Sequence, residues 1–142
     1  MATIRLATRL DIKAIEAIDG ALGMVSGRRP IVARAIKEGR VVVASESATI
    51  VGYARWSWFW DKIPFSTLVR VHPDQQRRGV GRALYAAVEV RLRDLGERFW
   101  ISSTEEDNWH SRRFHAALGF REIGALAELD QDVLEVFLRK DL

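Results

Sequence analysis

Two glycines, Gly79 and Gly81, stand in a basic stretch whose pattern points to chemistry. From Val71 to Arg82 the sequence reads Val-His-Pro-Asp-Gln-Gln-Arg-Arg-Gly-Val-Gly-Arg. An apolar run precedes the stretch, Pro73 stops that run, and apolar residues at helical spacing follow, so the pattern predicts a strand, a loop and a helix. The first N–H groups of a helix lack partners within it, and the helix dipole adds partial positive charge there. Because glycines let an anion approach the backbone closely, this junction is typical of a phosphate-binding loop.

Other glycine loops are a poorer match. A Walker loop ends in Gly-Lys-Ser/Thr, and a dinucleotide fingerprint has three glycines followed about twenty residues later by an acidic residue. The sequence contains neither pattern. For the two glycines alone, a plain tight turn between a strand and a helix remains an alternative.

The composition is that of a soluble globular protein. The chain has 142 residues, of which 48% are hydrophobic and 29% charged, so we expect one domain spanning residues 1–142. No apolar run approaches the roughly 18 residues of a membrane span, and the start of the chain does not resemble a signal peptide. We therefore expect a cytoplasmic protein without a membrane partner. The absence of cysteine excludes disulfides, thiolate metal sites and a thiol relay.

The sequence predicts seven strands and four helices. The predicted strands are 3–6, 40–45, 49–60, 65–71, 99–103, 120–124 and 133–139, and the predicted helices are about 8–22, 30–39, 80–96 and 109–118. This order, β-α-α-β-β-β-α-β-α-β-β, predicts an α/β fold (α+β, with a mixed sheet). Its two strands around the central helix should be parallel, as in a βαβ crossover. An acidic loop around Glu128 and Asp130 joins the last two strands.

A second motif begins about thirty residues after the first. It reads Asn108-x-x-Ser111-x-x-Phe114-His115-x-x-Leu118-Gly119-Phe120. Together with Gln76-x-x-Gly79-x-Gly81 it resembles the two signatures of the GNAT N-acetyltransferase superfamily, whose acetyl-CoA loop begins with Gln or Arg. The two motifs cover about the second half of the chain, and the predicted order of elements fits the topology of that family.

The resemblance implies an N-acetyltransferase that uses acetyl-CoA as co-substrate and requires no metal. The acceptor amine would attack the acetyl carbonyl directly in a ternary complex, with the backbone near Val71 serving as an oxyanion hole. Asn108 would contact the pantetheine arm or the sulfur end of the cofactor. The positions that the resemblance assigns to the cofactor are Val69, Arg70, Val71, Gln76, Arg77, Arg78, Gly79, Val80, Gly81, Arg82, Asn108, Ser111 and Phe114.

The sequence departs from the family pattern at both proton-transfer positions. Many relatives have a carboxylate base on the strand before the loop, where this chain has Thr67 and Leu68. The base is therefore unassigned. The proton of the acceptor ammonium would pass through ordered water to a carboxylate, with Glu105, Glu106 and Asp107 as the candidates. The alternative is that these three carboxylates are solvated loop charges. Many relatives also have a Tyr that protonates the departing thiolate, and His115 occupies that position. We expect His115 to be this acid; the alternative is a histidine without a chemical role.

The acceptor is expected to be a small-molecule or peptide amine. Trp56, Trp58 and Trp60 alternate along one predicted strand and share a face if that strand stays regular. Trp56 and Trp58, with Glu105, are the expected acceptor contacts. The alternatives are that the tryptophans pack in the core or form a contact in a homodimer.

Two other functions compete with catalysis. One is an acyl-CoA-binding sensor or regulatory domain of the same family. The other is a nucleic-acid-binding module, for which the small positive charge of +3 gives only weak support.

Overall fold

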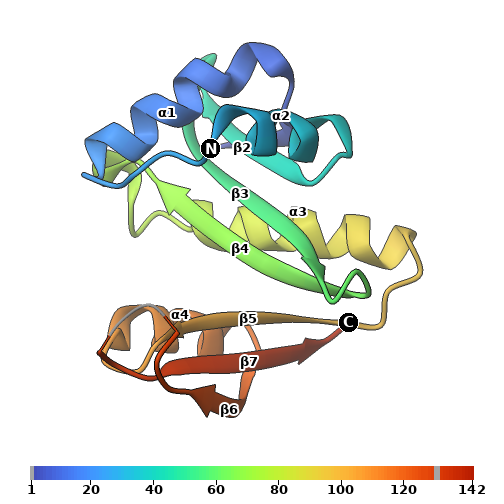
Figure 1. Cartoon of the computed structure of the whole chain (residues 1–142). Coiled ribbons are helices and arrows are strands. Elements are labelled where there is room, and N and C mark those ends of the chain that lie inside the picture. The colour runs from blue at the N-terminus through green and yellow to red at the C-terminus, as the bar shows by residue number, and fades with distance from the viewer. Residues whose placement is uncertain (1, 130–131) are drawn as a thin grey trace. The chain divides into compact units, whose positions relative to one another are not determined.

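The computed structural model describes residues 2–129 and 132–142, and its elements follow the predicted order (Figure 1). The strands are β1 (Thr3–Leu6), β2 (Val41–Glu46), β3 (Thr49–Phe59), β4 (Ile63–Val71), β5 (Phe99–Glu105), β6 (Arg121–Leu126) and β7 (Glu135–Asp141). The helices are α1 (Ile12–Ala21), α2 (Arg29–Lys37), α3 (Val80–Asp94) and α4 (Trp109–Ala117), with 3-10 turns η1 (Arg9–Asp11) and η2 (Pro73–Gln75). The predicted fold class and element order are confirmed. Asp130, part of the predicted acidic loop, lies outside the described residues.

The strands form a seven-stranded sheet in the order β1-β2-β3-β4-β5-β7-β6. The chain divides into two compact units, of which the first contains residues 1–57 and 67–91 and the second residues 58–66 and 92–142. Strands β3 and β4 contribute to both units. The prediction of a single domain over residues 1–142 stays a prediction.

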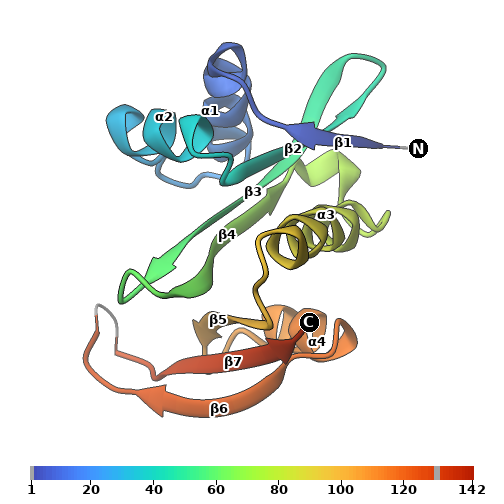
Figure 2. The ribbon, with the colours of Figure 1, turned by 90° about the vertical axis from the view of Figure 1, so that its right-hand side faces the viewer.

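The first unit is a layer of strands with helices on both faces. Figure 2 shows α1 and α2 on one side of the strands and α3 on the other. Apolar residues three apart place Ile15 and Ile18 on the inner face of α1, where they pack in a buried core with Ala35 of α2 and with Val41 and Val43 of β2. The strands β1, β2 and β3 pair in antiparallel register. This core fixes α1 and the following loop over the strands.

The second unit is built on β5. Phe65 at the start of β4 pairs with Ile101 of β5 in parallel, as the crossover predicted. Strand β7 pairs antiparallel with both β5 and β6. Trp100 and Leu138 are buried, and the rings of Trp100 and Phe120 lie 5.5 Å apart. These contacts tie the end of α4 to the strands.

Candidate functional site

The loop between β4 and α3 is fastened at its strand end. The backbone N–H of His72 donates to the carbonyl oxygen of Val51 at 2.8 Å, which holds the end of β4 against β3. The side-chain amide of Gln76 donates to the carbonyl oxygen of Val71 at 3.1 Å. Gln76, the first residue of the loop motif, therefore closes the turn that follows the strand.

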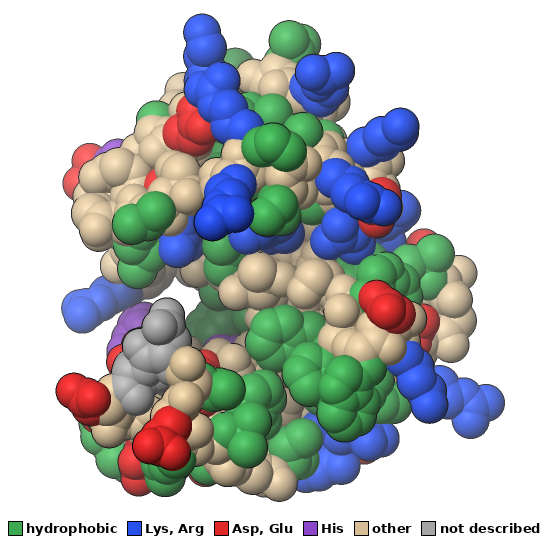
Figure 3. Space-filling view, in the orientation of Figure 1, with side chains coloured by type: hydrophobic (Ala, Val, Ile, Leu, Met, Phe, Trp, Pro, Cys, Tyr) green, Lys and Arg blue, Asp and Glu red, His purple; other side chains and the backbone are tan. Residues whose placement is uncertain are grey.

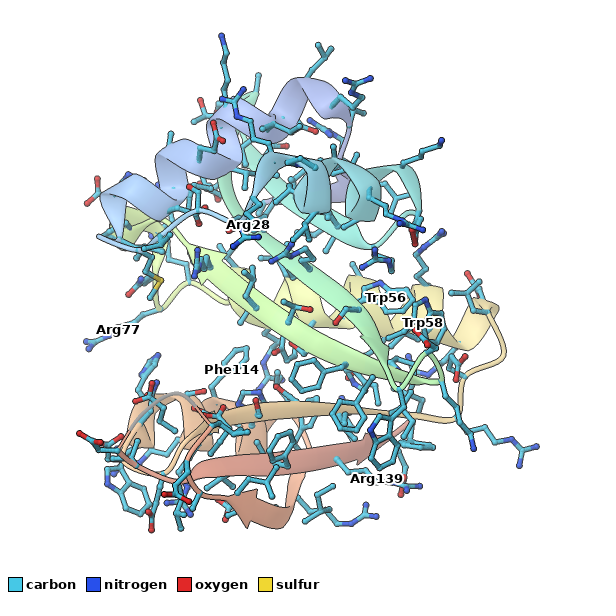
Figure 4. The ribbon with its side chains drawn as sticks, viewed as in Figure 1. Arg28, Trp56, Trp58, Arg77, Phe114 and Arg139 are labelled. Carbon is cyan, nitrogen blue, oxygen red and sulfur yellow. The ribbon has the colours of Figure 1, made fainter. Side chains whose placement is uncertain are left out.

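The last residues of the same loop, 76–79, are exposed, whereas Val80, the first residue of α3, is buried. Arg77 (φ 64°) and Gly79 (φ 80°) adopt the left-handed conformation, which turns the chain sharply into the helix. The first helical hydrogen bond runs from the N–H of Ala83 to the carbonyl of Gly79 at 3.0 Å. The N–H groups of the residues between these two consequently have no acceptor within the helix. Arg77 is exposed and extends away from the ribbon (Figure 4). This arrangement suits an anionic group.

Gly52 of β3 sets how closely α3 approaches the strands. A Cβ atom at this position would lie 3.2 Å from Cγ1 of Val80, 3.3 Å from Cδ1 of Leu84 and 3.1 Å from the carbonyl oxygen of Arg70. Any larger residue would push against the first turn of α3. Sequence reasoning did not single out Gly52, although a lone glycine inside a predicted strand is a signal of close backbone approach.

The side chains of strand β4 lie in two different environments. Thr67 is exposed and its hydroxyl donates to the hydroxyl oxygen of Ser57 at 2.9 Å, whereas Leu68 packs against the core. Neither position supplies a carboxylate. Val69 and Val71 are half-buried. The side chain of Arg70 donates to Asp19 at 2.8 Å and to the carbonyl of Val25 at 3.1 Å, and the assignment of Arg70 to the cofactor stays a prediction.

Asp19 is the centre of a buried polar cluster that the sequence did not reveal. Its side chain is 1% exposed, and one oxygen accepts from the Tyr53 hydroxyl at 2.6 Å and from Arg70 at 2.8 Å. Burial, and then the hydrogen bond to Asp19, raise the pKa of Tyr53. The cluster joins α1 to β3 and β4, so it positions the strand that leads into the loop.

The second unit brings the residues of the second motif together around α4. The Asn108 side chain caps the helix by accepting from the N–H of Ser111 at 3.1 Å, as the sequence predicted. Phe114 is half-buried, and its ring lies 5.6 Å from that of His115 in an edge-on arrangement. Capping occupies the carbonyl oxygen of Asn108 but does not use its amide N–H groups.

His115 is buried, with 3% of its surface exposed. Its Nδ1 lies 2.8 Å from the carbonyl oxygen of Ser111, so Nδ1 carries the proton, and its Nε2 lies 2.7 Å from the hydroxyl oxygen of Ser102. Burial lowers the pKa of His115, and the bond to Ser111 opposes this shift. A neutral ring with both nitrogens engaged does not favour the expected proton donor. The assignment of His115 as the acid stays untested, and this geometry favours the alternative of a histidine without a chemical role.

The residues expected at the acceptor lie in different environments. Trp56 is only 2% exposed, which matches the core alternative rather than an open aromatic wall. Trp58 is partly exposed, whereas Trp60 lies beyond the end of β3 with φ 56°, so the alternation stops before it. Glu105 ends β5 and is exposed, as are Glu106 and Asp107. Their roles in acceptor binding or proton transfer stay predictions.

Among residues 2–129 and 132–142, no three His, Cys, Asp or Glu side chains lie close enough together to hold a metal ion. No helix within the same ranges is long and apolar enough to cross a membrane.

The comparisons with known proteins agree with this geometry. The model of the acetyltransferase (GNAT) family matches residues 21–120, a range that includes the β4–α3 loop and the second motif. The chain belongs to this family. A GNAT acetyltransferase of Bacillus cereus has a solved structure with a TM-score of 0.85 and 27% identity, covering 99% of this chain and 97% of that one.

Two curated relatives of the GNAT chain are named for the compounds they modify. The L-amino acid N-acyltransferase MnaT of Escherichia coli K12 is 33% identical over 94 residues, which are 62% of this chain and 54% of MnaT. The L-methionine sulfoximine/L-methionine sulfone acetyltransferase of Salmonella typhimurium is 33% identical over 85 residues, which are 56% of this chain and 49% of that protein. The matches therefore span about half the length of these relatives.

Proposed function

We propose that this protein transfers an acetyl group from acetyl-CoA to the primary amine of a small molecule. The observation that carries the proposal is the β4–α3 loop, in which a GNAT signature coincides with a helix N-terminus and with exposed arginines just before it. The names of the curated relatives, an N-acyltransferase and an acetyltransferase, support the same reaction type.

The pyrophosphate of the cofactor binds to the loop in this proposal. The N–H groups of Val80, Gly81 and Arg82 have no acceptor within α3, and a bound phosphate oxygen would satisfy them. Arg77 and Arg78 are exposed and add positive charge that solvent partly screens. The backbone of Val69 and Val71 would pair with the pantetheine arm as though it were an added strand.

The reaction forms one bond and breaks one. The lone pair of the neutral amine attacks the acetyl carbonyl carbon, and an N–H near Val71 stabilises the negative oxygen of the tetrahedral intermediate. Collapse of the intermediate breaks the C–S bond, the amine loses a proton, and the thiolate of CoA gains one. Holding the two reactants together supplies much of the rate, because the step becomes effectively unimolecular.

A second candidate function is binding of acyl-CoA without catalysis. Thr67 and Leu68 favour it, since the first hydrogen-bonds to Ser57 and the second packs against the core. Neither can take a proton at neutral pH. In that case the protein would be a sensor or regulatory domain.

Two measurements test the proposal. Calorimetry with acetyl-CoA compares the parent with Gly81→Trp, whose bulk would obstruct the loop, and with Ala86→Trp, an exposed control position further along α3. We expect Gly81→Trp to bind on the order of tenfold more weakly or worse, and Ala86→Trp to bind as the parent does. Release of free thiol is then followed with a panel of amines.

The outcomes separate the two functions. Thiol release that depends on both acetyl-CoA and an amine supports the transferase. Tight binding without release for any amine supports the sensor instead. If a folded Gly81→Trp binds acetyl-CoA as well as the parent, the loop is not the cofactor site.

A further inference from the structure

Strand β6 lies at one edge of the sheet, within the second unit. Among the strands that the structure describes it has one neighbour, β7 (Figure 2), so the backbone N–H and C=O groups along its other side have no strand to pair with. All six of its residues, 121–126, are exposed. An exposed edge of this kind offers the pairing groups that a further strand needs.

The opposite edge of the sheet, at β1, is less suited to pairing with another chain. It is four residues long, and its Arg5 forms an ion pair with Asp11 at 2.8 Å. Short edge strands that carry charges are protected against pairing. The centre of β6 has small or apolar residues instead, and Ile123 and Leu126 each expose 51% of their surface. A partner that covers these two side chains gains hydrophobic free energy.

The two ends of the β6–β7 pair carry charges of opposite sign. At one end Arg121 lies opposite Arg139. At the other end Leu126 lies opposite Glu135, and the exposed Glu128 follows two residues later. The visible face of this unit in Figure 3 shows the same separation, with Asp and Glu side chains gathered at one end, Lys and Arg side chains at the other and hydrophobic side chains between them. The edge is therefore basic at its start, apolar in its middle and acidic at its end.

One carboxylate lies at the basic end without cancelling its charge. Asp141 accepts from Arg121 at 3.3 Å and from Arg139 at 3.0 Å. Both pairs are exposed, so each contributes little to stability, and one carboxylate against two guanidinium groups leaves net positive charge. The bond to Asp141 uses one nitrogen of Arg121, whose other N–H groups can donate to a further carboxylate.

A one-residue shift within β6 determines which of its side chains share a face. The β6–β7 register shifts between positions 122 and 124, so the strand contains a bulge. Arg121 and Leu126 lie opposite two residues of β7 that are four apart, and residues four apart in a strand share a face. The basic start of the edge and its apolar second half therefore present side chains on the same face.

A second copy of the chain fits this edge because the charge pattern is complementary to itself. When two β6 strands run antiparallel about a two-fold axis between Gly124 and Ala125, the basic start of each strand meets the acidic end of the other. Arg121 of one copy then lies opposite Glu128 of the second copy, and the symmetry repeats this pair. The small residues at the axis allow the two backbones to approach closely. Two strands in parallel would instead place like charges together.

We propose that this chain forms a homodimer through antiparallel pairing of the two β6 edges. Ile123 of each copy lies against Leu126 of the other, and two Arg121–Glu128 pairs flank this apolar centre. The proposal concerns assembly and does not depend on the transferase function. Measurements of the oligomeric state in solution therefore test it directly.

Sedimentation equilibrium of the parent from about 1 to 200 µM covers the dissociation constants expected of a small interface. We expect dimers that dissociate on dilution. Ile123→Lys places two charges in the apolar centre and should raise the dissociation constant by on the order of tenfold or more. Leu10→Lys is the matched control, because Leu10 is 93% exposed in the η1 turn of the first unit, and it should dimerise as the parent does. A parent that stays monomeric throughout this range overturns the proposal.

Charge reversal tests the antiparallel arrangement, at low ionic strength because salt screens exposed charges. Arg121→Glu alone and Glu128→Arg alone each create two like-charge contacts across the axis, so each variant should be monomeric or dimerise much more weakly. An equimolar mixture of the two variants restores two opposite-charge pairs and should form heterodimers. Arg93→Glu reverses an exposed charge on α3 in the same unit and should leave the dimer intact.

The charge variants change exposed side chains, so they test the edge even if Ile123→Lys does not fold. Circular dichroism verifies that each variant is folded. A mixture that stays monomeric contradicts the antiparallel pairing, as do single variants that dimerise like the parent. A dimer that is lost only in Trp60→Ala, a variant of an exposed residue between β3 and β4, has its contact elsewhere and overturns the proposal as well.

Discussion

The Nε2 atom of His115 lies 2.7 Å from the hydroxyl oxygen of Ser102, and both side chains are buried in the second unit. Because Nδ1 donates its hydrogen to the Ser111 carbonyl oxygen, the Nε2 atom of the neutral ring accepts a hydrogen bond from the Ser102 hydroxyl. His115 thereby connects α4 to β5. Its position follows from this internal bonding, whatever the role of the ring in catalysis.

Replacement of His115 tests whether the histidine donates a proton. Since the ring is neutral and both nitrogens are engaged, we expect His115→Gln to retain kcat within about threefold and to lower Tm. Steady-state kinetics and thermal melts measure both effects. A loss of roughly 10²-fold in kcat with unchanged Tm and acetyl-CoA affinity, partly recovered in His115→Tyr, would instead identify His115 as the acid.

The same residue predicts a pH dependence of stability. Burial holds the pKa of His115 below its ordinary value of 6.5, so the unfolded chain takes up a proton that the folded chain resists. The contribution of His115 to the free energy of unfolding should therefore be fully present above about pH 6.5 and should decrease as the pH falls from there toward the folded pKa. Denaturant melts across this range should show a weaker dependence in His115→Gln. His110→Gln, at an exposed position on α4, is the control and should match the parent.

Replacement of Gly79 tests whether cofactor binding depends on the conformation of the β4–α3 loop. No atom lies within 4 Å of a Cβ built there, but its φ of 80° is unfavourable for alanine. We expect Gly79→Ala to destabilise the protein by about 1 kcal/mol and to weaken acetyl-CoA binding as the loop shifts. Gly124→Ala, also in open space but without a positive φ, should change neither quantity. Equal Tm and equal calorimetric affinity in both variants would show that the loop does not depend on this conformation.

The Asp19–Arg70 pair should be important for stability. Loss of the carboxylate in Asp19→Ala leaves the Arg70 guanidinium and the Tyr53 hydroxyl without their shared acceptor, and we expect a cost of about 3 kcal/mol. Chemical denaturation measures it. Glu16→Gln, which breaks the more exposed pair with Arg29, serves as the control and should have a much smaller effect. A similar small effect for Asp19→Ala would show that water readily replaces the carboxylate.

Trp56 and Trp58 should respond differently to truncation. Trp56 is buried, so Trp56→Ala should destabilise the protein by about 3–5 kcal/mol. Trp58 is partly exposed, and Trp58→Ala should raise the KM for the best acceptor of the amine panel while leaving acetyl-CoA affinity nearly unchanged. Thermal melts, calorimetry with acetyl-CoA and steady-state kinetics compare the stability, cofactor affinity and acceptor KM of the two variants. An unchanged acceptor KM in Trp58→Ala would remove Trp58 from the acceptor site.

Local signals in the sequence were sufficient for the order of elements and for the loop. Pro73 ends the apolar run of β4, glycines precede the helical spacing of α3, and Asn108 caps α4, each within a few residues. These features depend on backbone sterics and on hydrogen bonds between near neighbours. The sequence therefore determined the fold class, the family resemblance and the place of the cofactor loop. It was less reliable at the end of β3, where a tight turn with φ 56° at Trp60 interrupts the predicted alternation.

Only the tertiary structure decided which side chains are buried and which have partners. Asp19 and Arg70 are 51 residues apart, and nothing near either residue in the sequence indicates that they pair. The same holds for His115, whose Nε2 atom accepts a hydrogen bond from the hydroxyl of Ser102 on β5. Burial and pairing depend on long-range packing, which sets the local dielectric and the available partners of each side chain. The types and spacing of residues that are neighbours in the sequence do not show how distant segments pack.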